Sequence, residues 1–220
     1  MKVATSIAGL LASAFMASAH AGPILAEGFD DVSTLPASGW VQTNLSVPLG
    51  STSWFQGNSA AFASQAGAPN AYVAANFLNT SPLGGVIDDW LISPELSLGG
   101  GATLTFYTRT ADPGFDDLLE VRFSSGSGTA ASGFTTLLLT VDSSTPYPDS
   151  DWQLFSVTLP SAVSGRFAFH YSVADGTTAD YIGIDTVNVA AAAIPEPSSY
   201  VLMGLGLVGL ALYRRRGASV

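Results

Sequence analysis

Apolar and polar residues alternate along several short segments of the chain. In segment 166–173, Phe167, Phe169 and Tyr171 share one face, and His170 lies on the other. A period of two is typical of a strand with one face on a core. This pattern, or a short run of β-branched and aromatic residues, predicts strands at 24–29, 39–43, 52–56, 71–76, 90–92, 103–110, 118–125, 135–141, 153–159, 166–173 and 181–189.

Turn-forming residues separate these segments, and residues 22–194 show no convincing helical period. Gly, Pro, Ser, Asn and Asp gather at 47–51, 57–69, 112–116, 126–133, 143–151 and 175–179. The Ala/Ser/Gly-rich stretch 125–132 is expected to be a flexible surface loop. Strands without crossover helices pair antiparallel, so the pattern predicts an all-β domain, either a two-sheet sandwich or a barrel.

The last predicted strand contains a break in its pattern. Ile182 and Ile184 have one parity, whereas Val187 and Val189 have the other. A β-bulge near Asp185 would keep both pairs on the core. Burial of this strand on both faces is an equally good reading.

The N-terminus has the form of a secretory signal. Lys2 precedes an apolar run over 3–19, and Ala19-His20-Ala21 ends it before Gly22. A charged start, an apolar centre and a small-x-small site are recognised by signal peptidase, so we expect cleavage after Ala21 and export. The alternative is a membrane anchor or a core helix.

The C-terminus has three parts in order after a short linker at 191–194. Pro195-Glu196-Pro197 precedes an apolar segment over 198–213, and Arg214, Arg215 and Arg216 follow. Sixteen residues make roughly 24 Å of helix, short for a hydrocarbon core of about 30 Å, and the arginines would stay in the cytoplasm. This tail resembles the PEP-CTERM sorting signal, which implies transient membrane insertion and processing by an exosortase-type membrane peptidase. A permanent anchor is the alternative.

Charge limits the partners of the domain between the two ends. Residues 22–194 contain three arginines and 16 carboxylates, and 3 minus 16 gives a net charge of -13. Such a surface repels phosphate backbones, which argues against nucleic-acid binding.

The order of several motifs over 22–190 resembles the bacterial choice-of-anchor J domain, which is similar to cleaved-adhesin and MAM-type domains. The matching residues are Glu27-Gly28-Phe29, Gly39-Trp40, Trp54, Asp89-Trp90-Leu91-Ile92-Ser93-Pro94, Leu104-Thr105-Phe106-Tyr107, Trp152 and Ile184-Asp185-Thr186-Val187. The resemblance implies an antiparallel jelly-roll β-sandwich of the adhesion or carbohydrate-binding type. The resemblance does not by itself supply an activity.

The amino-acid composition of residues 22–194 also excludes several classes of catalytic site. Residues 22–194 have no Cys, no Lys and one histidine, His170. This excludes thiol nucleophiles, Schiff-base lysines and multi-histidine metal centres, and no Gly-x-Ser-x-Gly elbow supports a serine triad. We therefore expect a non-enzymatic adhesion or matrix protein at the cell surface, associated with extracellular polysaccharide. A specific carbohydrate-binding module and a carboxylate-dependent glycosidase remain alternatives.

Two ligand predictions follow. Glu27 and Asp185 lie on the terminal strands, with Asp30 nearby, and these carboxylates are expected to bind structural calcium, since calcium prefers oxygen ligands and is available outside the cell. Ordinary surface carboxylates are the alternative. Large aromatic residues of a sandwich are more often part of the core, and this is the alternative for all four tryptophans. Trp54 precedes a polar loop, so it is the one expected to be the exception, exposed and stacked on a glycan.

Overall fold

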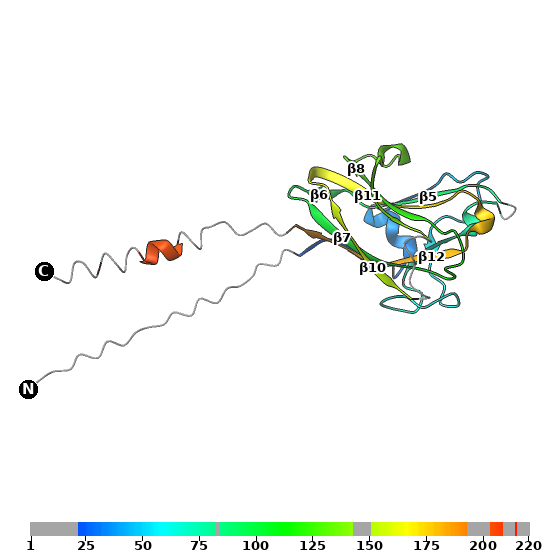
Figure 1. Cartoon of the computed structure of the whole chain (residues 1–220), viewed down its shortest axis with the longest axis horizontal. Helices are drawn as coiled ribbons and strands as arrows, with labels where there is room; N and C mark the ends of the chain where they lie inside the picture. Colours follow the sequence, from blue (N-terminus) through cyan, green and yellow to red (C-terminus); the bar gives the residue numbers. More distant parts are fainter. Residues whose placement is uncertain (1–21, 82–83, 143–150, 193–202, 209–213, 215–220) are drawn as a thin grey trace, which may run out of the picture.

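The alternating segments pair into two antiparallel sheets that stack as two layers (Figure 1). The computed structural model describes residues 22–81, 84–142, 151–192, 203–208 and 214. The first sheet has the order β10 (Gln153–Leu159), β7 (Ala102–Thr110), β12 (Tyr181–Ala191), β4 (Val73–Asn76) and β3 (Phe55–Gln56), and β1 (Pro23–Glu27) pairs with β12. The second has the order β2 (Val41–Asn44), β5 (Ile87–Ile92), β11 (Ala162–Val173), β8 (Leu119–Ser125) and β9 (Thr136–Val141), and β6 (Leu96–Leu98) pairs with β11. The predicted all-β sandwich is confirmed.

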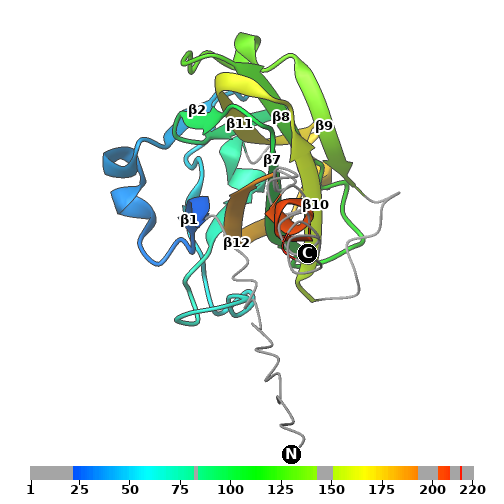
Figure 2. The ribbon, with the colours of Figure 1, turned by 90° about the vertical axis from the view of Figure 1, so that its left-hand side faces the viewer.

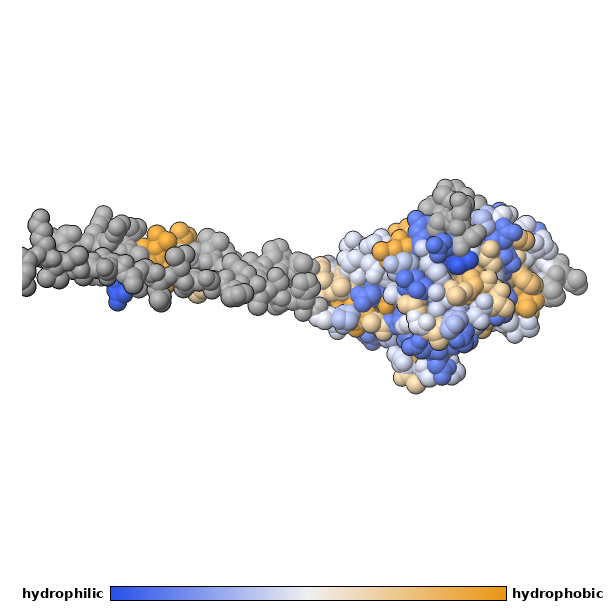
Figure 3. All heavy atoms as spheres, turned by 90° about the horizontal axis from the view of Figure 1, so that it is seen from below, coloured by the Kyte–Doolittle hydropathy of each residue, from blue (hydrophilic) through white to orange (hydrophobic). Residues whose placement is uncertain are grey.

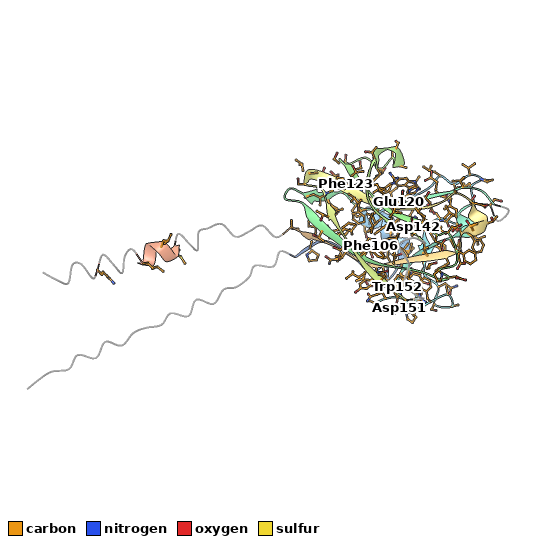
Figure 4. All side chains as sticks on the ribbon, viewed as in Figure 1. Phe106, Glu120, Phe123, Asp142, Asp151 and Trp152 are labelled. Carbon is orange, nitrogen blue, oxygen red and sulfur yellow. The ribbon has the colours of Figure 1, made fainter. Side chains whose placement is uncertain are left out.

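Large apolar side chains from both sheets fill the space between the layers. Phe106 of β7 meets Phe169 of β11 with ring centroids 4.9 Å apart, and Phe169 contacts Phe167 at 5.4 Å. All three are fully buried, as the alternation predicts. Figure 4 shows Phe106 between the layers.

The predicted bulge is present in β12. Its register with β7 shifts between Asp185 and Asn188, and Thr186 has a φ of 50°. Ile184 and Val187, on opposite sides of the shift, both belong to the interior cluster. The segment from Tyr181 to Asp185 is also continuously buried, so the second reading holds for the first half of the strand.

Four short 3-10 helices interrupt the strands: η1 (Val32–Ser38), η2 (Phe77–Asn79), η3 (Ala131–Gly133) and η4 (Gly176–Thr178). In η1 the Asp31 side chain accepts the Ser33 N–H, and Gly39 ends the helix with a φ of 87°. The left-handed conformation at this end suits glycine, which has no Cβ. The strand expected from Gly39 therefore begins at Val41.

A loop covers part of the outer face of each sheet. Phe62 and Tyr72 of the 57–72 loop pack with Tyr181 on the first sheet. Phe134 packs with Trp90 on the second sheet and is only 2% exposed. The expected surface loop 125–132 thus leads into an anchored residue. Figure 3, seen from below the first sheet, shows hydrophilic and hydrophobic residues interspersed on that face.

The ends of the domain lie side by side, because β1 pairs antiparallel with the end of β12 (Figure 2). β12 runs to Ala191, one residue past the expected domain boundary. Residues 1–21 and most of 193–220, which hold the expected cleavage site and sorting segment, lie outside the described residues. Residues 203–208 are helical. Within the described part of the chain, no helix has the length and apolar character needed to span a membrane.

Candidate functional site

Trp54 is buried, contrary to the prediction that it would be exposed. Its exposed fraction is 3%, because it belongs to the main cluster of buried apolar side chains, which also contains Trp40. The alternation of a single segment cannot reveal this packing, since Trp54 precedes the two-residue strand β3 and is covered by residues distant in sequence. Trp54 nevertheless forms part of a cavity wall.

We call this cavity of about 880 Å³ the tryptophan hollow. It lies where η1 approaches β2 and β3, and its lining consists of Asp31, Val32, Ser33, Pro36, Trp40, Val41, Gln42, Trp54 and Gln56. Three further cavities have volumes of about 390, 340 and 290 Å³. Binding sites for small ligands are typically concave, partly apolar and few, so the tryptophan hollow is the leading candidate.

The two indole N–H groups of this hollow have no hydrogen-bond partner. The nitrogens Nε1 of Trp40 and Trp54 are both buried and unpaired. By contrast, Nε1 of Trp90 donates to Asp88, and Nε1 of Trp152 donates to the carbonyl of Ala63. A buried donor without a partner is unfavourable by about 1–3 kcal/mol, and since both nitrogens are buried, a ligand acceptor could pair with them only if the surrounding side chains moved apart.

Gln56 holds the floor of the hollow in place. Its Oε1 accepts the Val32 N–H at 2.8 Å, and its Nε2 donates to the carbonyls of Phe29 and Asn70 at 2.9 and 2.6 Å. One amide thus joins η1, the segment after β1 and the 57–72 loop. We infer that Gln56 is a positioning residue whose bonding capacity is used inside the protein.

Asp89, in the Asp89–Pro94 motif, fixes the segment that carries Trp54. Its carboxylate accepts from the Ser53 hydroxyl at 2.9 Å and from the Asn79 amide at 2.5 Å. Burial raises the pKa of Asp89 to about 7, although the Ser53 hydrogen bond opposes this. The motif therefore supplies a buried structural anchor next to the hollow.

The three residues predicted to bind calcium line one cavity. Glu27, Asp30 and Asp185 belong to the wall of the 340 Å³ cavity between β1 and β12. Within the residues that the structure describes, no group of three Asp, Glu, His or Cys side chains is arranged to hold a metal ion. The three carboxylates therefore line the same cavity, but their oxygens are not arranged as the ligands of a calcium ion.

The Asp185 carboxylate already has several donors. Its Oδ2 accepts the N–H groups of Gln65 and Ala66 at 2.8 and 3.1 Å, and its Oδ1 accepts that of Thr186 at 2.5 Å. Burial raises the pKa of Asp185, and these hydrogen bonds oppose that shift. In this arrangement Asp185 fastens the 57–72 loop to β12.

His170 lies at the centre of a network that the sequence pattern did not reveal. Its Nδ1 lies 2.8 Å from Oε2 of Glu120 and its Nε2 lies 2.9 Å from Oδ1 of Asp88. The ring stacks on Trp90 with centroids 3.9 Å apart. The parity of His170 was predicted correctly, but the residue is only 9% exposed, because neighbouring strands and Trp90 cover it.

Arg122 completes this network. It donates through Nε and Nη2 to the two oxygens of Glu120, at 2.6 and 3.2 Å. Burial raises the pKa of Glu120, but the hydrogen bonds and charges of Arg122 and His170 outweigh burial and lower it. His170, Asp88, Trp90 and Arg122 line the 390 Å³ cavity, which we call the histidine hollow.

The tail decides the sorting class. Residues 193–216 match the family model of the PEP-CTERM protein-sorting motif. The chain carries a PEP-CTERM signal. This confirms the resemblance inferred from Pro195-Glu196-Pro197 and the arginines, and it indicates export and sorting to the cell surface.

The domain resembles cleaved adhesin domains of known structure. The K1 domain of Lys-gingipain from Porphyromonas gingivalis W83 aligns with a TM-score of 0.61 and 26% identity, over 77% of this chain and 98% of that one. The K3 domain of the same protein aligns with a TM-score of 0.56 and 24% identity, over 78% and 99%. No curated protein matches the chain. The cleaved-adhesin fold agrees with the expected adhesion-type sandwich.

Proposed function

We propose that this protein is a non-enzymatic adhesion or matrix component that binds extracellular polysaccharide through the tryptophan hollow. Signal peptidase would cut after Ala21, and an exosortase-type peptidase would process the tail at Pro195-Glu196-Pro197. The membrane helix expected at 198–213 would hold the chain only until that step. The observation that carries the binding proposal is the hollow of about 880 Å³ walled by two indoles whose N–H groups are unpaired.

The chemistry of a polysaccharide fits these walls. Sugar rings present apolar C–H faces that suit aromatic and aliphatic surfaces, and their hydroxyl oxygens accept hydrogen bonds. Gln42 and Ser33 add polar groups to the same lining. Surface sorting would place the domain where polysaccharide is abundant.

The buried carboxylates support a binding role over hydrolysis. Asp89 and Asp185 are engaged by internal donors, and Asp117 accepts from Tyr171, Thr110 and the Asp180 N–H. A glycosidase needs two carboxyl groups free to face a sugar across a cleft. Neither the tryptophan hollow nor the histidine hollow is lined by two carboxylates. The 340 Å³ cavity is lined by three, but there Glu27 accepts the Phe29 N–H and Asp185 accepts three backbone N–H groups.

A carbohydrate array tests this function. The full chain, exported by a host that carries the sorting machinery, should be retained on a subset of polysaccharides and should release no reducing ends. Retention on none would contradict binding, and hydrolysis of any would favour the glycosidase alternative.

Fractionation tests sorting separately. We expect the chain to leave the membrane fraction, and we expect a chain lacking Pro195-Glu196-Pro197 to remain there. Equal membrane association of both chains would contradict processing and favour a permanent anchor.

We also propose structural calcium at Glu27, Asp30 and Asp185, supported by their shared cavity between the first and last strands. An ion there would join the two ends of the domain, and the Asp185 oxygens would have to exchange some of their present donors for the ion. Calcium should raise the melting temperature of the chelator-treated protein by several degrees, and Glu27→Gln should reduce this rise. No shift on adding calcium would contradict the proposal.

A further inference from the structure

The tryptophan hollow lies in a part of the chain that has no ionisable charge. From Val32 through Ile87 the sequence contains no Asp, Glu, Lys, Arg or His, although the chain has 17 acidic residues, 7 Lys or Arg residues and 2 histidines elsewhere. This stretch supplies every lining residue of the hollow except Asp31. A ligand in the hollow therefore meets one charged group, and that group is negative.

The cations of the domain are not available to the hollow. The Arg109 guanidinium lies 4.4 Å from the centroid of the Phe62 ring, and Arg122 is bound to Glu120. Arg166 donates to the carbonyls of Ser93 and Ser127. These are the three basic residues of segment 22–194, and none of them lines the hollow.

Asp31 keeps part of its charge facing outward. Its Oδ1 accepts from the N–H and the hydroxyl of Ser33, at 3.0 and 2.6 Å. Within the described residues no donor is assigned to Oδ2, and the side chain is exposed. A carboxylate or sulfate brought into the hollow would meet this charge without a compensating cation, inside a domain of net charge -13.

We propose that the tryptophan hollow selects neutral polysaccharides and rejects uronic-acid and sulfated chains, and that Asp31 is a specificity-determining residue. This inference rests on the proposed polysaccharide binding and names its ligand class. Selection against a wrong partner through like charge is a common source of specificity. The charge of Asp31 does not repel a neutral sugar, which would be recognised through its hydroxyl groups and ring faces.

The test measures retention of the full exported chain on two neutral polysaccharides, galactan and dextran, and on two acidic ones, alginate and polygalacturonate. The polysaccharides are used as sodium salts and no divalent salt is added, so that no added divalent ion bridges two carboxylates and any ion held by the protein stays in place. We expect at least about tenfold stronger retention on a neutral polysaccharide at low salt, and a smaller ratio at 0.5 M salt because ions screen the repulsion.

Asp31→Asn should raise the ratio of acidic to neutral retention about fivefold at low salt, since it removes one unit charge at close range. Asparagine can still accept the Ser33 N–H, so η1 keeps its cap. Asp175→Asn is the matched control. Asp175 caps η4 in the same way, accepting the N–H and the hydroxyl of Thr177, but it does not line the hollow, so the ratio should not change.

The outcomes separate the two proposals. Retention on alginate or polygalacturonate equal to that on neutral chains, or no effect of Asp31→Asn, overturns the neutral specificity and leaves polysaccharide binding intact. Retention on none of the four overturns polysaccharide binding and the specificity with it.

Discussion

Two hollows of this sandwich are walled by tryptophan, but they differ in the hydrogen-bonding capacity that remains. In the histidine hollow, Trp90 donates to Asp88, and both carboxylates and both ring nitrogens of the network have close partners. In the tryptophan hollow, the N–H groups of Trp40 and Trp54 are unpaired. Polar groups whose donors and acceptors are all paired stabilise a fold, whereas a buried donor without a partner can still form a hydrogen bond with a ligand. This difference is why we propose a structural role for the histidine hollow and a binding role for the tryptophan hollow.

Two adjacent carboxylates of strand β5 lie in different environments, and one of them should produce the largest of the effects predicted here. Asp88 faces the histidine hollow, and Asp89 is buried against Ser53. Since burial raises the pKa of Asp89 to about 7, the folded protein retains this proton after the unfolded chain has lost it. The stabilising contribution is complete below about pH 4 and is lost as pH rises to about 7.

We therefore expect Asp89 to lower the free energy of unfolding on the order of 2–4 kcal/mol as pH rises over this range. In the Asp89→Asn variant, the unfolding free energy should depend less on pH. Chemical denaturation of both proteins at pH 4 to 8 measures it. An unchanged slope in the variant would show that Asp89 ionises normally.

His170→Ala should have the next largest effect. It leaves Glu120 and Asp88 each without one partner and opens a gap beside Trp90, so we expect a loss of about 2–3 kcal/mol in unfolding free energy. Thermal denaturation measures the loss. Polysaccharide retention at a temperature where the variant is folded should not change. If retention fell while stability did not, the assignments of the two hollows would be reversed.

Trp54→Phe should act on binding. The variant keeps an aromatic ring but lacks the unpaired N–H, so we expect about tenfold weaker polysaccharide retention and a change in unfolding free energy below about 1.5 kcal/mol. Trp152→Phe is the matched control. Trp152 lies below the first sheet, away from Glu120 of the second layer (Figure 4), and its N–H is paired with Ala63. Equal retention by both variants would contradict a role for the Trp54 N–H.

Gln42→Ala should have the smallest effect. Gln42 contributes a polar side chain to the lining, and removing one neutral hydrogen bond should weaken retention about threefold with little change in melting temperature. Affinity electrophoresis in polysaccharide gels can resolve this difference. A loss larger than that of Trp54→Phe would place the ligand nearer β2 than the indoles.

The sequence pattern predicted the strands well, because period-two alternation directly reflects burial on one face. It also located the bulge at Asp185, where the apolar parity changes. It missed β6, which has three residues, and η1, which is too short to show a helical period. Asp31 two residues before Ser33, with Gly39 after the segment, was the available signal for a capped turn.

The candidate site was less predictable, because it depends on contacts between distant segments. The prediction that Trp54 is exposed was wrong, because Trp54 belongs to the same buried cluster as Trp40, and its burial depends on how η1 packs near β2 and β3. The partners of His170 come from β5 and β8, and are 82 and 50 residues away along the chain. Alternation assigns a residue to a face and does not say what covers that face.

The central claim is that the tryptophan hollow binds polysaccharide, and a crystal structure of the protein with a neutral oligosaccharide tests it most directly. The account predicts sugar density between η1 and strands β2 and β3, with hydroxyl oxygens within hydrogen-bond distance of Nε1 of Trp40 or Trp54. Sugar bound instead over Trp90 and His170, with the tryptophan hollow holding no sugar, would contradict it.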